Sequence, residues 1–194
     1  MKNSVRFLNL NILSLTQKEL LEQMAEGVLY TPNLDHLIKL QYDREFYDIY
    51  QQAEWIVCDS QILYLVSKLL KRSLPMAIPG SSFFTAFYNY HVNNPNCKIF
   101  LLGAAEGVAK KAMENINRRV GRQIVVGAHS PSYGFEKNEQ ECEELIRIVN
   151  ESGATVLLVG AGAPKQEKWI AKYRSRMSGV KLFSISKKIL SDAI

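Results

Sequence analysis

The feature that most constrains this sequence is the alternation of short apolar runs with longer segments of helical period. Runs such as 99–102 and 156–159 are typical of buried strands, whereas segment 108–119 repeats its apolar residues at helical spacing. Strands that alternate with helices through short loops indicate a mostly parallel sheet with helices on both faces. We therefore expect one α/β domain over residues 1–194, without a linker or repeat.

The same patterns predict the individual elements. The expected strands cover residues 5–10, 55–58, 98–102, 123–127, 155–159 and 180–185. Thr16 and Glu19 form a capping-box pattern, which opens a helix whose apolar face extends to Val28. Further helices are expected at 34–52, 62–70, 83–92, 108–119 and 139–150, and one more is opened by residues 160–164.

Cysteine and histidine usage argues against a disulfide or metal site. Cys58, Cys97 and Cys142 are odd in number, lie far apart and form no C-x-x-C pair, so we expect buried reduced thiols. The three histidines are also scattered. No local spacing therefore suggests a metal, and no cofactor is expected.

Apolar runs are too short to span a bilayer, which takes roughly 18 residues, and the first residues do not resemble a signal peptide. We therefore expect a cytoplasmic protein. Its net charge of +5 is concentrated late in the sequence. Residues 1–164 carry 16 basic and 17 acidic side chains, whereas residues 165–194 carry eight and two.

This basic cluster, from Lys165 to Lys188, has two interpretations. It is either a solvated helix face or a surface attracted to anionic lipid or pyrophosphate. The attraction would place the protein peripherally on the inner face of the plasma membrane. Nucleic acid is not expected as a partner, because no aromatic residues interleave with the basic ones in a binding motif.

Ligands of open α/β sheets bind outside the carboxyl ends of the strands. That rule selects residues 31–33, 59–60, 103–107 and 160–167. Gly103 precedes a helix N-terminus, so its segment is either a plain turn or a phosphate site. It matches neither the dinucleotide fingerprint nor the P-loop, which argues against an oxidoreductase and a P-loop NTPase.

The segment around Gly162 is the more informative one. Small residues allow close approach of a ligand, and Pro164 suits the first turn of a helix. Lys165, Gln166 and Glu167 follow in that turn. A sugar-phosphate pocket is the functional interpretation, and a favourable carboxylate–dipole contact is the structural one.

Polar residues at the other two places also allow two interpretations. Asp59 follows an apolar run and is either a helix N-cap or a general base that deprotonates an acceptor hydroxyl. Thr31 and Asn33 are either turn residues around Pro32 or hydrogen-bond partners of a sugar.

Several motifs together resemble the WecG/TagA/CpsF glycosyltransferases. They are residues 31–33, Asp59, residues 100–103 with 107–109 and, most specifically, the stretch Gly-Ala-Pro-Lys-Gln-Glu-Lys-Trp-Ile at 162–170. Their order and spacing match over roughly residues 5 to 185. The resemblance implies a Rossmann-like domain.

The resemblance also implies an activity. Such enzymes transfer a sugar from a UDP-sugar, of N-acetylmannosamine or glucose type, onto a polyprenyl-diphosphate-linked acceptor, with inversion and without a metal. Their products serve teichoic acid or other cell-surface polysaccharides. By position, Asp59 corresponds to the general base, whereas Thr31, Asn33 and Gln166 correspond to contacts of the donor sugar or diphosphate. Gly103, Gly162, Pro164, Lys165 and Glu167 complete the expected substrate site.

Three departures from the family pattern motivate an alternative function. Ser60 stands where the family usually has glycine, and Ala77 and Ser82 stand near positions that are often basic and acidic. The sequence also lacks the family's basic C-terminal tail, so we expect a shortened chain. The alternative is a non-catalytic or truncated relative that binds a nucleotide-sugar or a partner enzyme. A homo-oligomer is left open.

Overall fold

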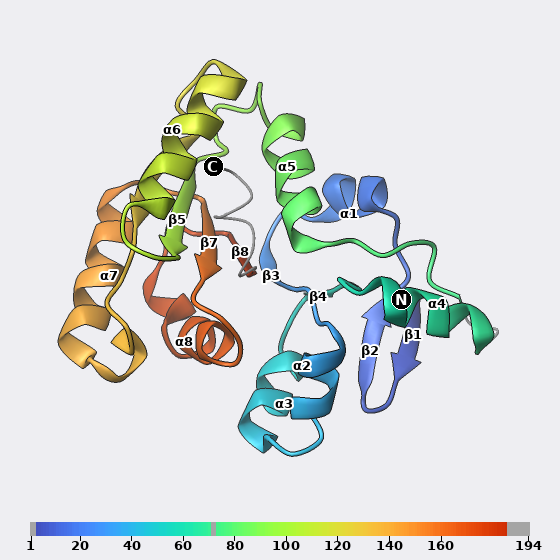
Figure 1. Ribbon diagram of the computed structural model, residues 1–194. Coiled ribbons are helices and arrows are strands. Elements are labelled where there is room, and N and C mark those ends of the chain that lie inside the picture. The colour runs from blue at the N-terminus through green and yellow to red at the C-terminus, as the bar shows by residue number, and fades with distance from the viewer. Residues whose placement is uncertain (1–2, 71–72, 186–194) are drawn as a thin grey trace.

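The computed structural model describes residues 3–70 and 73–185. Within them, a six-stranded sheet has the order β4-β3-β8-β7-β5-β6, and all its strand pairs are parallel (Figure 1). The strands are β3 (Gly27–Tyr30), β4 (Trp55–Ile56), β5 (Ile99–Gly103), β6 (Val125–His129), β7 (Val156–Gly160) and β8 (Leu182–Ile185). The expected parallel α/β fold is confirmed.

Helices cover both faces of this sheet. Ile99 and Leu101 of β5 belong to an apolar core that includes residues of α1 (Gln17–Gln23), α5 (Gly80–Tyr90) and α6 (Val108–Val120). Phe100 and Leu102 point the other way, into a core that includes residues of α3 (Arg44–Gln51), α7 (Glu139–Glu151) and α8 (Lys165–Tyr173). Because successive side chains of a strand alternate between faces, the continuous apolar run at 99–102 reflects burial on both sides.

Strand β3 was not expected from the sequence. The capping box of Thr16 and Glu19 is confirmed, but α1 ends at Gln23, and Val28 lies in β3 rather than in the helix. Gly27 takes a φ of 104°, which favours glycine, and the carboxylate of Glu54 accepts a hydrogen bond from Val28 N at 2.7 Å. The apolar spacing fits a helix, but these contacts redirect the chain into the sheet.

Two other expected elements also differ. The helix expected at 34–52 is two helices, α2 (Leu34–Lys39) and α3, because Asp43 caps the second by accepting from Phe46 N at 2.9 Å. The strand expected at 5–10 is a hairpin of β1 (Ser4–Phe7) and β2 (Leu10–Leu13), which form a separate antiparallel sheet.

The remaining elements begin and end close to the expected positions. They include α4 (Gln61–Leu69). The short helices η1 (Phe135–Lys137) and η2 (Arg174–Arg176) were not expected from the sequence. Pro164 directly precedes α8, which begins at Lys165. Cys58, Cys97 and Cys142 are buried free thiols, as expected.

Candidate functional site

All four segments selected from the sequence lie at the carboxyl edge of the sheet. Thr31 follows β3, Gly103 ends β5 and Gly160 ends β7. Hydrogen bonds continue the β3–β4 pairing beyond its last strand residues, since Asp59 N donates to Pro32 O at 3.3 Å. The parallel topology therefore gathers these segments at one edge, in two groups separated by β8.

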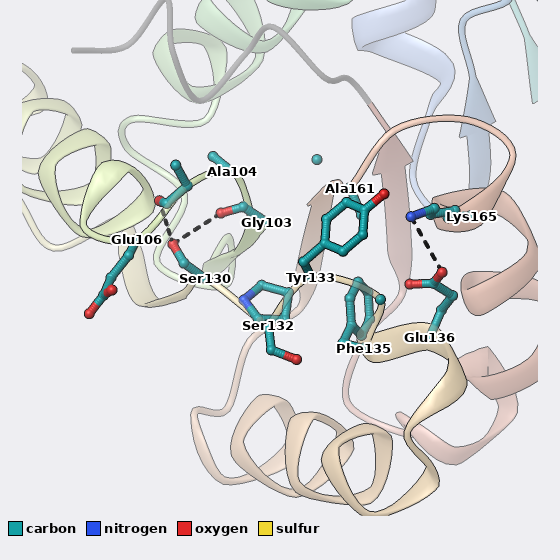
Figure 2. A pocket seen from close by; sticks show the side chains of 14 residues that line it. Gly103, Ala104, Glu106, Ser130, Ser132, Tyr133, Phe135, Glu136, Ala161 and Lys165 are labelled. Atoms are coloured by element: carbon teal, nitrogen blue, oxygen red, sulfur yellow. Dashed lines mark hydrogen bonds and ion pairs between the residues drawn. The ribbon is translucent and has the colours of Figure 1, made fainter.

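The first group surrounds a pocket of about 680 Å³ at the ends of β5, β6 and β7 (Figure 2). Its lining consists of Gly103, Ala104, Ala105, Glu106, Ser130, Pro131, Ser132, Tyr133, Gly134, Phe135, Glu136, Gly160, Ala161 and Lys165. Of the expected site residues, Gly103 and Lys165 are part of it.

Two glycines face each other in this pocket. Gly103 has a φ of 129°, and a Cβ placed on it would lie 2.6 Å from the carbonyl carbon of Gly160. Neither this backbone conformation nor this distance suits a larger residue. Glycine at 103 therefore lets the ends of β5 and β7 approach each other beside the pocket.

The loop 130–136, which follows β6, forms the opposite wall of the pocket. Ser130 Oγ lies within hydrogen-bonding distance of two carbonyl oxygens, 3.2 Å from Gly103 O and 3.0 Å from Ala105 O (Figure 2). The loop is thereby fixed to the turn after β5. This loop is not among the four segments expected from the sequence, although it follows the strand expected at 123–127, which ends at the same edge.

A cation and an aromatic ring lie side by side at the rim of the pocket. Lys165 Nζ lies 4.6 Å from the centroid of the Tyr133 ring and 3.4 Å from Glu136 Oε1 (Figure 2). The Tyr133 side chain is 99% exposed. A phosphate can bind such a cation, and a flat base can stack on such a ring.

The second group consists of Thr31, Asn33 and Asp59. Thr31 is buried, and Asn33 caps α2 by accepting from His36 N at 3.2 Å. Asp59 is half-buried, and its Oδ1 accepts from Gly80 N, at the first residue of α5, at 3.0 Å. Asp59 is not the cap of α4, as one interpretation of the sequence had it, because Ser60 takes that position.

Gln166 and Glu167 lie in the first turn of α8, next to the loop that precedes the helix. Gln166 Oε1 accepts from Gly162 N at 2.9 Å, and its Nε2 donates to Glu167 Oε1 at 3.2 Å. Both side chains are buried, and neither lines the pocket. The bond from Gly162 N instead holds the preceding loop in place, and Ala161 of this loop lines the pocket.

Glu167 is the more unusual of the two. Its side chain is completely buried, and its Oε2 has no hydrogen-bond partner. Burial raises the pKa of this carboxyl to about 7. Burial and the nearby charge of Glu167 also raise the pKa values of Tyr30 and Tyr50 above their usual range.

The segment that departs from the family pattern lies beside Asp59. Ile78 N donates to Cys58 O at 2.6 Å, and Ala77 is buried. Ser82 Oγ donates to Pro79 O at 3.0 Å. Residues 73–82 include no charged side chain, so this segment offers Asp59 a main-chain N–H but no cation.

Most cations of the basic cluster that the structure describes have acidic partners. Lys168 binds Asp43 and Glu45 at 2.9 and 2.7 Å, and the other pairs are Lys165–Glu136, Lys172–Glu139, Arg174–Glu54 and Arg176–Glu143. Lys187 and Lys188 lie outside the described residues. Pairing reduces the field that these cations exert at a distance, so the attraction to anionic lipid stays a prediction.

Residues 3–70 and 73–185 contain neither a cluster of metal ligands nor a helix that could span a membrane. No three His, Cys, Asp or Glu side chains lie close enough together to hold a metal ion. None of the helices in those ranges combines the length and the apolarity that a membrane span requires.

Comparison with known proteins gives a family. The model of the family "Glycosyl transferase WecG/TagA/CpsF" matches residues 5–186. This chain therefore belongs to the WecG/TagA/CpsF family of glycosyl transferases.

Individual relatives are also found. The chain is 23% identical over 175 residues to the N-acetylglucosaminyldiphosphoundecaprenol N-acetyl-beta-D-mannosaminyltransferase of Bacillus subtilis (strain 168), covering 89% of this chain and 66% of that protein. It is 27% identical over 141 residues to the protein of the same name from Staphylococcus aureus (strain NCTC 8325 / PS 47), covering 72% and 52%. The chain thus spans between half and two thirds of the length of these relatives.

Proposed function

We propose that this chain transfers a sugar from a UDP-sugar, of N-acetylmannosamine or glucose type, to a polyprenyl-diphosphate-linked acceptor in the synthesis of teichoic acid or another cell-surface polysaccharide. Family membership supports the reaction class. The names of the relatives support N-acetylmannosamine and a diphosphoundecaprenol acceptor. The enzyme would work peripherally at the cytoplasmic face of the membrane.

The observation that carries this proposal is the pocket at the ends of β5, β6 and β7. Its volume of about 680 Å³ falls within the usual range for ligand sites, about 300–1,000 Å³. It lies where open α/β sheets bind nucleotides, and it includes the turn that leads to the N-terminus of α6. We assign the diphosphate to this turn and to Lys165, and the uracil ring to Tyr133.

Asp59 would act on the acceptor. Its carboxylate would take the proton from the acceptor hydroxyl while that oxygen bonds to the anomeric carbon of the donor sugar. The bond from that carbon to the UDP oxygen breaks on the opposite face, and UDP leaves with the electron pair. In the metal-independent reaction that the family resemblance implies, Lys165 and main-chain N–H groups would stabilise the charge of the leaving UDP.

The other expected residues receive two kinds of role. We assign Thr31 and Asn33, which flank the turn after β3, to contacts with the donor sugar near Asp59. Gln166 and Glu167 are buried, and their hydrogen bonds run to Gly162 and to each other. We therefore assign them the role of holding the Gly162–Pro164 turn in place.

A binding and turnover experiment tests the proposal. Calorimetry with UDP should show binding, and incubation with UDP-N-acetylmannosamine and a lipid-diphosphate N-acetylglucosamine acceptor should release UDP. Tyr133→Ala should weaken UDP binding about tenfold, since one stacked base contributes roughly 1–3 kcal/mol. Tyr90→Ala, at an exposed tyrosine outside the pocket, is the matched control. Absent UDP binding, or equal binding by both variants, would contradict the assigned donor site.

A non-catalytic relative is the second candidate. The absence of a charged side chain from residues 73–82, beside Asp59, favours it. This candidate predicts that UDP binds in the calorimeter while no UDP-sugar is consumed in the presence of acceptor. Sugar transfer by the wild-type chain would exclude it.

A further inference from the structure

Helix α4 carries an unusual number of exposed apolar residues. Ile62, Leu65, Val66, Leu69 and Leu70 are each between 38% and 83% exposed, and we call them the α4 stripe. Single exposed apolar residues are normal on protein surfaces, whereas several neighbouring ones mark an interaction site.

The five residues lie on one side of the helix. At about 100° per residue, their positions fall within an arc of about 140°. The buried side of the helix is formed by Leu63 and Ser67. Ser67 Oγ donates to Tyr64 O at 2.6 Å and accepts from Leu74 N at 3.0 Å. The bond from Leu74 N ties the buried side of α4 to a residue beyond the end of the helix, so α4 cannot turn its stripe toward the core without breaking it.

The stripe also lies close to the proposed acceptor site. Ser60 caps α4 and directly follows Asp59, so the first stripe residue, Ile62, is only three positions from the proposed base. Figure 1 places α4 at the periphery of the molecule, away from α6 and α7. A surface that contacts the stripe would therefore approach Asp59 from outside the sheet.

We propose that the α4 stripe docks the protein on the surface of a lipid bilayer, so that Asp59 meets the diphosphate-linked sugar of an acceptor anchored there. This rests on the proposed function, in which the acceptor is lipid-linked. The exposed side of a helix is convex, which suits insertion among headgroups rather than enclosure of a single hydrocarbon chain. Residues 61–70 contain Lys68 and no acidic residue, as expected for a segment that faces anionic lipid.

This docking differs from attraction through the Lys165–Lys188 cluster. Apolar insertion persists at high salt, whereas binding through the cluster would be screened. Salt dependence therefore tells the two surfaces apart.

Flotation with vesicles of phosphatidylglycerol and phosphatidylcholine tests the proposal. Wild type should bind in low and in high salt. The double variant Leu65→Gln, Leu69→Gln should lose roughly tenfold in partitioning for each leucine replaced, because each buries its side chain in the interface. Both side chains are exposed, so circular dichroism and calorimetric UDP binding in solution should be unchanged. Tyr90→Gln, another exposed apolar residue, should bind vesicles like wild type.

Other outcomes would overturn the docking. The proposal is wrong if wild type does not bind vesicles, or if the double variant binds them as well as wild type does. It is also wrong if wild type forms a dimer in analytical ultracentrifugation and the double variant does not. The last result would assign the stripe to a second copy of the chain. Vesicle binding without UDP binding would instead contradict the proposed function and leave the docking intact.

Discussion

The two halves of the sheet's carboxyl edge are built differently. On one side, β5 and β7 are five residues long, completely buried, and end in Gly103 and Gly160, which both line the pocket. On the other side, β3 and β4 have four and two residues and lead to Thr31, Asn33 and Asp59. The first half offers space and main-chain groups, and the second offers polar side chains.

This difference suggests a division of labour. Main-chain groups at a strand end and a helix N-terminus suit a phosphate, which needs no particular side chain. A proton transfer, in contrast, needs one titratable group at a defined place, and the hydrogen bond from Gly80 N holds Asp59 there. Donor binding and acceptor activation should therefore respond to different substitutions.

Asp59→Asn should have the largest effect. Loss of the general base should lower kcat about 10²–10⁴-fold. The amide oxygen can still accept from Gly80 N, so the start of α5 is retained. Steady-state kinetics should show this loss, while calorimetry shows an unchanged Kd for UDP. A variant that kept its turnover, or one that lost UDP binding as well, would contradict the separate roles of the two halves.

Gly103→Ala should damage the other half. The new Cβ would meet the Gly160 backbone in a conformation that alanine rarely adopts, so we expect a loss of about 3 kcal/mol in the free energy of unfolding. Gly121→Ala is the control, because Gly121 also has a positive φ, of 71°, but no atom within 4 Å of an added Cβ. It should lose only about 1 kcal/mol in urea unfolding. Equal losses would show that the approach of β5 and β7 is not tight.

Glu167→Gln should change how the free energy of unfolding depends on pH. The pKa of Glu167 is raised to about 7 in the folded protein, so the folded state binds more protons than the unfolded state between about pH 4.5 and 7. Stability therefore falls as pH rises through this range, by up to roughly 3 kcal/mol. The glutamine variant should lack this fall and should be more stable than wild type at pH 8. The free energy of unfolding of both proteins is measured with urea at pH 5 and pH 8. An equal change between the two pH values in both proteins would argue against a buried, ionising Glu167.

The sequence predicted the parts of this molecule that depend on local pattern. Apolar runs and the glycines after them indicated β5, β7 and the edge at which ligands bind. β3 was missed because Met24, Ala25 and Val28 also fit a helix, and the contact that decides against it comes from Glu54. The pocket wall at 130–136 and the burial of Glu167 depend on packing between segments far apart in the chain. Such packing has no signature in a local window.

The position of β8 has a consequence for synthesis on the ribosome. Within the described residues, β8 pairs with β3 on one side and with β7 on the other, and no other strand joins the two halves of the sheet. Translation adds about 5–20 residues per second, so β3 and β4 emerge several seconds before residues 182–185. Until then, β3 and β7 lack the partner strand that pairs with both of them. In the proposed function, Asp59 and the pocket would act together only after this late strand has paired with β3 and β7.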